Sequence, residues 1–152
     1  MEWFIKAFIR ASLLWFTLGI ALGLAMSARP EWVVYRPAHA HMNVVGFIAM
    51  MILGVGYQLL PRLFGGPLWS AKFAIAHLWL ANLGLAAMVA GFMLAPHIGA
   101  PGNMVTTLGG SLYTLGALLF VINLWQTFNG ADARHRPPPG ATKSRPLPTV
   151  GE

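Results

Sequence analysis

The chain has 152 residues, of which 57% are hydrophobic and only 9% are charged. A water-soluble domain of this size needs far more charged side chains to cover its surface, so a soluble globular protein is excluded. The sequence has no cysteine, which excludes disulfides, thiolate metal sites and thiol catalysis. The net charge of +6 comes from basic residues that flank apolar runs and fill the tail. Membrane topology explains this pattern, and no nucleic-acid partner is expected.

Four apolar runs are long enough to cross a bilayer, which takes about 20 residues each. Their expected bounds are residues 3–26, 38–60, 70–95 and 103–128. The second run is expected to stop at Pro61 and the third at Pro96, because proline disfavours helix continuation. The sequence therefore predicts an all-α integral membrane protein, with one transmembrane domain over residues 1–129. Residues 130–152 are rich in proline, glycine and charge, and predict a disordered tail.

The basic residues also predict how the chain is oriented in the membrane. Lys6, Arg10, Arg62, Lys72 and the tail fall on one side. On the other side, the connection at residues 95–102 has no Lys or Arg, and residues 27–37 carry Arg29 and Arg36 against Glu31. The positive-inside rule then places both termini in the cytoplasm. We expect a multi-pass protein of the cell's inner membrane, with the start of the second run near the outer face.

Two histidines lie at that start, in the stretch RPAHAHMNVV. Residues two apart on an α-helix are separated by about 200°, so His39 and His41 point to nearly opposite sides. Two ligands of one metal on a helix would instead lie three or four residues apart. The pair therefore predicts two different sites, one on each side of the helix. Imidazole is a common axial ligand of haem iron, which makes haem the expected cofactor.

Other residues near the pair are candidates for contacts with a haem. Arg36 could pair with the propionates, or be an ordinary interfacial charge. Asn43 could bond a ligand or a neighbouring helix, and His97 lies on the same side of the membrane as a reserve ligand or propionate contact. Gly46, like Gly19 and Gly23, could leave room for a flat porphyrin. Close packing between helices is the alternative explanation of these glycines.

Three polar residues fall toward the other membrane face. His77 lies near the start of the third run, far from the histidine pair along the membrane normal, and we expect an interfacial role for it. Tyr57 and Gln58 could line a route for protons or for a quinol.

Residues 36–128 resemble the last part of subunit I of the haem–copper oxidases, the family that includes cytochrome c oxidases and nitric oxide reductases. The resemblance is carried by His39-x-His41, by Tyr57 to Pro61 with the following Arg62, and by the Ala76-His77 pair that opens the third run. It implies that His39 ligates a high-spin, active-site haem and His41 a low-spin haem, from opposite faces of one helix.

The family's subunit I has many more helices, arranged as similar four-helix arcs around a pseudo-threefold axis. The resemblance thus implies that this chain forms one arc and that three copies rebuild the ring as a homotrimer. Each pocket between arcs would then receive His39 from one protomer and His41 from its neighbour. The histidines that hold the active-site copper in the family lie on helices outside this resemblance, so no copper is expected.

The expected function is that of a membrane b-type cytochrome, with bis-histidine haem for electron transfer or redox sensing. Without cysteine a c-type attachment is impossible, so haem b is the expected form. One alternative is a sensor or reductase of nitric oxide, oxygen or carbon monoxide with an open coordination position. Another is a cofactor-free structural subunit of a respiratory complex. The expected partners are further copies of the chain, the lipid bilayer, and a quinol or a cytochrome as redox partner; enzymatic activity is left open.

Overall fold

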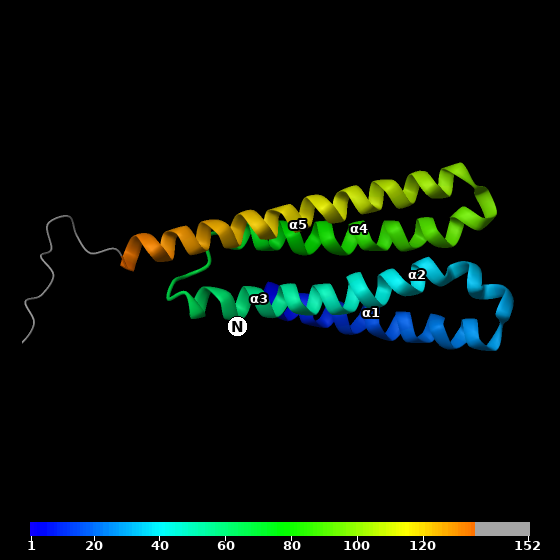
Figure 1. Cartoon of the computed structure of the whole chain (residues 1–152), viewed down its shortest axis with the longest axis horizontal. Coiled ribbons are helices and arrows are strands. Elements are labelled where there is room, and N and C mark those ends of the chain that lie inside the picture. Colours follow the sequence, from blue (N-terminus) through cyan, green and yellow to red (C-terminus); the bar gives the residue numbers. More distant parts are fainter. Residues whose placement is uncertain (136–152) are drawn as a thin grey trace, which may run out of the picture.

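The computed structural model describes residues 1–135, and all regular secondary structure within them is helical (Figure 1). Four helical runs in this part of the chain are long and apolar enough to cross a membrane. They are Trp3–Ala28, Pro30–Leu63, Ala71–Ile98 and Ala100–Asp132. The predicted all-helical class and the four predicted spans are therefore confirmed, and the chain has the make-up of a multi-pass membrane protein.

The second run is not a uniform helix. The order of elements is α1 (Trp3–Ala28), the 3₁₀ segment η1 (Pro30–Tyr35), α2 (Arg36–His41), the π-helical segment η2 (Met42–Ala49), α3 (Met50–Leu63), α4 (Ala71–Ile98) and α5 (Ala100–His135). The paired histidines thus stand directly before a π-helical stretch, a form that is rare and frequent at functional sites.

Two predicted helix ends are wrong, because glycine rather than proline ends these helices. Pro61 and Pro96 lie inside the last turns of α3 and α4, where a missing N–H removes only one hydrogen bond of the helix. The chain turns at Gly65 and Gly99, which have φ values of 71° and 64°. These left-handed conformations suit glycine and are typical of helix C-termini.

The last helix extends beyond its predicted end at residue 128. Helix α5 continues to His135, so residues 130–135 of the predicted tail are helical. Residues 136–152 lie outside the described residues, and disorder there stays a prediction.

Helices α4 and α5 form a tight antiparallel hairpin, seen side by side in Figure 1. Glycines allow the two backbones to approach closely. A Cβ atom on Gly84 would lie 2.5 Å from the backbone nitrogen of Tyr113, and one on Gly102 would lie 2.5 Å from Cα of Ala95. Such small-residue contacts are typical of helix packing in membranes, where apolar side chains gain little by leaving lipid.

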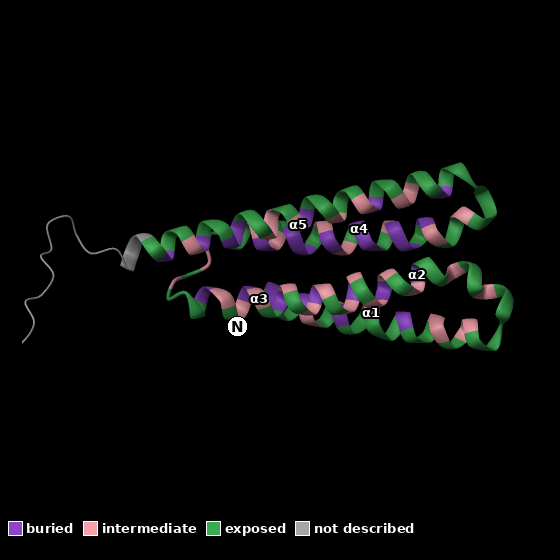
Figure 2. Ribbon diagram, in the orientation of Figure 1, coloured by how far each residue is buried: buried purple, intermediate pink, exposed green. Residues whose placement is uncertain are grey.

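The second helical run packs between α1 and α4. Gly46 marks the point where the three meet, because a Cβ there would lie 2.6 Å from Cβ of Trp15 on α1 and 2.9 Å from Leu85 on α4. Figure 2 shows buried residues along these internal contacts and exposed residues on the outward sides of all helices. Many of the exposed residues are large and apolar, including Leu24, Ile52, Leu63, Leu108 and Trp125. A lipid environment explains this exposure.

Helix α5 also fixes the connection between α3 and α4. The fully buried Asn123 accepts a hydrogen bond from the backbone N–H of Ser70 at 3.0 Å and donates one to the Ser70 carbonyl at 2.8 Å. Thr127 accepts from the backbone N–H of Trp69 at 3.0 Å. These side chains satisfy backbone groups just ahead of α4.

Candidate functional site

His39 lies against α1, half-buried, at the end of the bundle where α1 turns into η1 and α4 turns into α5. We call this the histidine end. Its Nδ1 is 2.8 Å from the carbonyl oxygen of Gly19. A carbonyl can only accept, so Nδ1 carries the hydrogen and Nε2 keeps a free lone pair. Gly23 makes room for the ring, since a Cβ there would lie 2.7 Å from Cε1 of His39.

His41 has the same tautomer but a different neighbour. Its Nδ1 is 2.8 Å from the carbonyl oxygen of Pro37, which again leaves the Nε2 lone pair free. Its ring lies 4.6 Å from that of Phe92 on α4, with the ring planes at 41°. The two imidazoles of the pair therefore contact different helices.

Asn43 packs one turn after His39. Its Nδ2 donates to the backbone carbonyl of His39 at 2.8 Å, and a Cβ on Gly19 would lie 2.5 Å from the same nitrogen. Asn43 Nδ2 also approaches Nδ1 of His39 at 3.4 Å. Because Nδ1 already donates to Gly19, this approach is a contact between two donors and no hydrogen bond. Asn43 thus helps to fill the space between His39 and α1.

A cavity of about 340 Å³ lies beside His39 and is lined by Met26, Val33, Arg36 and His39. Arg36 is exposed and reaches it from the first turn of α2. The cavity therefore brings together one predicted ligand and the predicted partner of haem carboxylates. The Arg36 guanidinium can therefore bind an anionic group of a molecule whose metal is ligated by His39.

The structure separates the other predicted residues from this cavity. Gly46 contacts Trp15 and Leu85, where helix packing accounts for the absence of a side chain. His97 is exposed near the end of α4, and its Nε2 is 2.8 Å from the hydroxyl of Tyr35. This bond ties the end of α4 to η1.

Within residues 1–135, no group of three or more His, Asp or Glu side chains is placed to hold a metal ion. A site built only from protein ligands is therefore not formed by a single described chain. The available imidazoles suit a metal that brings its own equatorial ligands and needs one or two axial nitrogens from protein.

His77 is a correction to the sequence-based expectation of an interfacial role. The side chain is fully buried, because Phe8 on α1 and Phe120 on α5 cover it, with ring centroids 4.9 and 5.6 Å away. Its Nδ1 is 3.1 Å from the hydroxyl of Tyr57. Its Nε2 is buried and has no hydrogen-bond partner among the described residues. Sequence reasoning missed this because the covering rings come from distant parts of the chain.

The chain is similar to subunits of known cytochrome c oxidases. No protein-family model matches the chain. The cytochrome c oxidase subunit 1 of Rhodobacter capsulatus is 31% identical over 68% of the chain. The cbb3-type cytochrome c oxidase subunit CcoN1 of Stutzerimonas stutzeri is 25% identical over 70%. A cytochrome c oxidase subunit 1 homolog of Agrobacterium tumefaciens is 27% identical over 78%.

The chain thus carries a partial resemblance to haem–copper oxidase subunit I. It covers 24%, 27% and 25% of these relatives, so it spans about a quarter of the length of the curated proteins that it matches. The resemblance predicted from the sequence is confirmed at this level.

Proposed function

We propose that the chain is a b-type cytochrome of the inner membrane, with His39 and His41 as axial ligands of haem iron. One observation supports this most strongly: both imidazoles donate Nδ1–H to a backbone carbonyl and keep Nε2 free. Histidines that ligate metals almost always have their other nitrogen bonded in this way, which fixes the ring and raises its basicity. The two rings belong to different irons, because they contact different helices.

The residues around His39 fit the cofactor. Gly19 and Gly23 provide a surface without side chains on which the imidazole lies, and Asn43 supports it from the next turn. The Arg36 guanidinium at the cavity can pair with a propionate carboxylate. When bound, haem supplies reversible one-electron chemistry at its iron.

An oligomer completes the site in this proposal. The four residues that line the cavity beside His39 cannot enclose a porphyrin, so the remaining wall has to come from another chain. In a homotrimer, each pocket takes His39 from one protomer and His41 from its neighbour. Closed rotational symmetry repeats the same pocket at each interface.

The proposed orientation follows from charge. Both termini are proposed to lie in the cytoplasm and the histidine end to face outward. The connection at Gly99 has no basic residue and the other connection at this end carries Arg29 and Arg36 against Glu31, whereas Lys6, Arg10, Arg62 and Lys72 lie toward the opposite end. A quinol or a cytochrome is the proposed redox partner. Copper is not part of this proposal.

A second candidate is a gas-binding haem protein. His39 and His41 of one chain contact different helices. If a neighbouring protomer does not supply the second histidine, a single imidazole therefore reaches each iron. The sixth position would then be open to nitric oxide, oxygen or carbon monoxide.

The test is the haem content of detergent-purified protein, measured for the wild type and for His39→Ala, His41→Ala and His97→Ala. We expect the first two variants to lose most of the haem and His97→Ala to keep it, because Nε2 of His97 is bonded to Tyr35. Wild-type protein without haem, helical and monodisperse, would refute the proposal and leave a structural subunit.

A further inference from the structure

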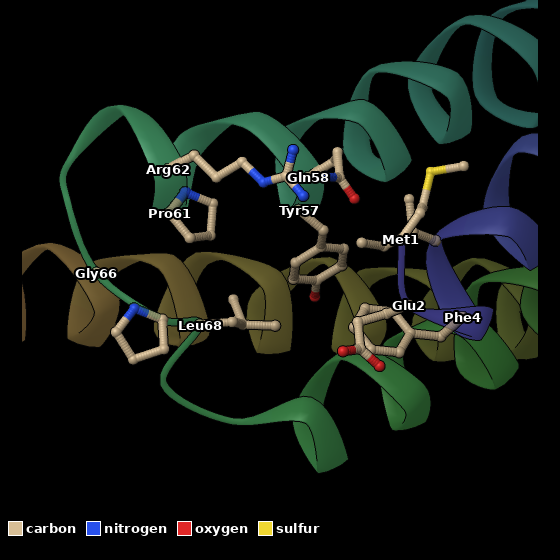
Figure 3. A pocket seen from close by; sticks show the side chains of 11 residues that line it. Met1, Glu2, Phe4, Tyr57, Gln58, Pro61, Arg62, Gly66 and Leu68 are labelled. Carbon is tan, nitrogen blue, oxygen red and sulfur yellow. The ribbon is translucent and has the colours of Figure 1, made fainter.

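A second cavity lies at the end of the bundle opposite the histidine end, where α1 begins and α3 ends. Its volume is about 270 Å³, which is room for roughly nine waters at about 30 Å³ each. Figure 3 shows Arg62 and Gln58 on one side of this cavity and Glu2 on the other, with the ring of Tyr57 in the wall. Opposite charges therefore face one cavity from separate sides.

Arg62 is held in place by Gln58, one turn earlier on α3. With its amide turned so that the oxygen faces the guanidinium, Gln58 accepts from Nη2, Nη1 and Nε of Arg62 at 2.6, 2.8 and 3.1 Å. A guanidinium has more N–H groups than one oxygen can accept, so donors stay available for a ligand. Its planar fork matches the oxygens of a phosphate, and holding it in advance lowers the entropy lost on binding. The Arg62 side of the cavity therefore suits a phosphate group.

The depth of the cavity in the membrane indicates where such a phosphate comes from. The cavity lies at the ends of two runs that are long and apolar enough to span a bilayer, Trp3–Ala28 and Pro30–Leu63. Trp3 and Trp69 adjoin its lining residues in the chain and are 55% and 51% exposed. Exposed tryptophans at the ends of membrane helices mark the level of the lipid headgroups. A phosphate at this level belongs to a phospholipid.

An apolar groove along α3 fits an acyl chain of the same lipid. It has a volume of about 510 Å³, and its lining runs from Leu63, next to Arg62, inward to Met51, with Phe120 of α5 at its side. From Leu63 to Met51 the helix rises about 18 Å, close to the roughly 15 Å that half of the hydrocarbon core measures. The groove therefore matches one acyl chain of one leaflet in length and in polarity.

We propose that this end of the chain binds one phospholipid whose headgroup ends in a primary ammonium, as in phosphatidylethanolamine. Arg62 binds the phosphate, Glu2 binds the ammonium, and the groove along α3 takes an acyl chain. The two charged sides favour a zwitterion, because an anionic lipid would leave the carboxylate of Glu2 facing the ligand without a cation. A quinol, the candidate ligand from the sequence, has no charge to pair with either side.

Native mass spectrometry of the full chain in detergent measures the dissociation constants of added lipids. The probes are dioleoyl phosphatidylethanolamine and dioleoyl phosphatidylglycerol, which differ only in the headgroup. We expect the first to bind about tenfold or more tightly than the second, because only its ammonium pairs with a carboxylate. Arg62→Gln should weaken both lipids, whereas Glu2→Gln should abolish the preference between them. Lys72→Gln and Glu31→Gln are the matched controls, because they remove one charge of each sign outside the cavity and should leave the preference unchanged.

Equal affinities of the two lipids for the wild type would overturn the proposal, and so would an unchanged preference in a helical, monodisperse Glu2→Gln. Free phosphoethanolamine is the last probe, because it has the charges of the headgroup and no acyl chain. If it binds as tightly as the lipid, the ligand is a soluble phosphate and the lipid site is refuted. Haem content does not enter these measurements, so the lipid site and the cytochrome proposal are tested separately.

Discussion

Two backbone carbonyls control the chemistry of the paired imidazoles. The Gly19 carbonyl takes the Nδ1 hydrogen of His39, and the Pro37 carbonyl takes that of His41. These bonds fix which ring nitrogen has a lone pair before any ligand arrives. The sequence predicts opposed imidazoles from their spacing, but it does not predict these acceptors, because the Gly19 carbonyl belongs to a separate helix.

Gly23→Ala tests whether α1 holds His39 in place. The new methyl group would lie 2.7 Å from Cε1 of His39, so the ring must turn away and lose its bond to Gly19. We expect haem content to fall by about tenfold or more, the range seen when outer-shell partners of metal ligands are changed. Gly56→Ala is the control, because its Cβ would meet Phe120 at an ordinary 3.5 Å. Equal haem content in the two variants would contradict this role of α1.

At the scale of elements, one helix secures the start of another. Helix α5 bonds the backbone of Ser70 through Asn123 and that of Trp69 through Thr127, just before α4 begins at Ala71. Since α4 carries Phe92 and His77, its placement affects both the histidine end and the contact between His77 and Tyr57.

Asn123→Leu leaves the backbone N–H of Ser70 without its partner, whereas the Ser70 carbonyl keeps the bond from the Ala74 N–H at 3.4 Å. An unsatisfied buried polar group destabilises a protein by about 1–3 kcal/mol, so we expect a loss of about 1–2 kcal/mol in the free energy of unfolding for this half-buried group. Reversible unfolding in mixed micelles measures it. Gln126→Leu, at an exposed position of the same helix, should change little. A similar stability for both variants would mean that α5 does not hold this connection.

The elements show how far the sequence predicts this molecule. Apolar runs predict the four helices because hydrocarbon thickness fixes their length. The ends at Pro61 and Pro96 are wrong because positive-φ glycines, at Gly65 and Gly99, decide where the chain turns. The π-helical segment after His41 leaves no signal in composition, and the burial of His77 depends on side chains from three other helices.

At the scale of the whole molecule, the cavity beside His39 and the cavity lined by Tyr57, Gln58 and Arg62 lie at opposite ends of the helix bundle. One end has histidines with free nitrogens, and the other has a polar cavity.

Co-expression of His39→Ala and His41→Ala chains tests whether ligands are shared between protomers. Each variant keeps one histidine of the pair. A pocket therefore has both ligands only where a His41→Ala chain supplies His39 and a neighbouring His39→Ala chain supplies His41. Every trimer that contains both variants has one such interface out of three, so mixed trimers should regain about a third of the wild-type haem. Tagged chains purified as mixed oligomers would show this recovery. Haem-free mixed oligomers would contradict ligation across the interface.

The optical spectrum of reduced wild-type protein, recorded before and after carbon monoxide, tests the cytochrome proposal most directly. With two imidazoles on each iron, we predict sharp low-spin bands that carbon monoxide leaves unchanged. An immediate shift on adding carbon monoxide would contradict paired ligation and favour an open coordination site at His39 or His41.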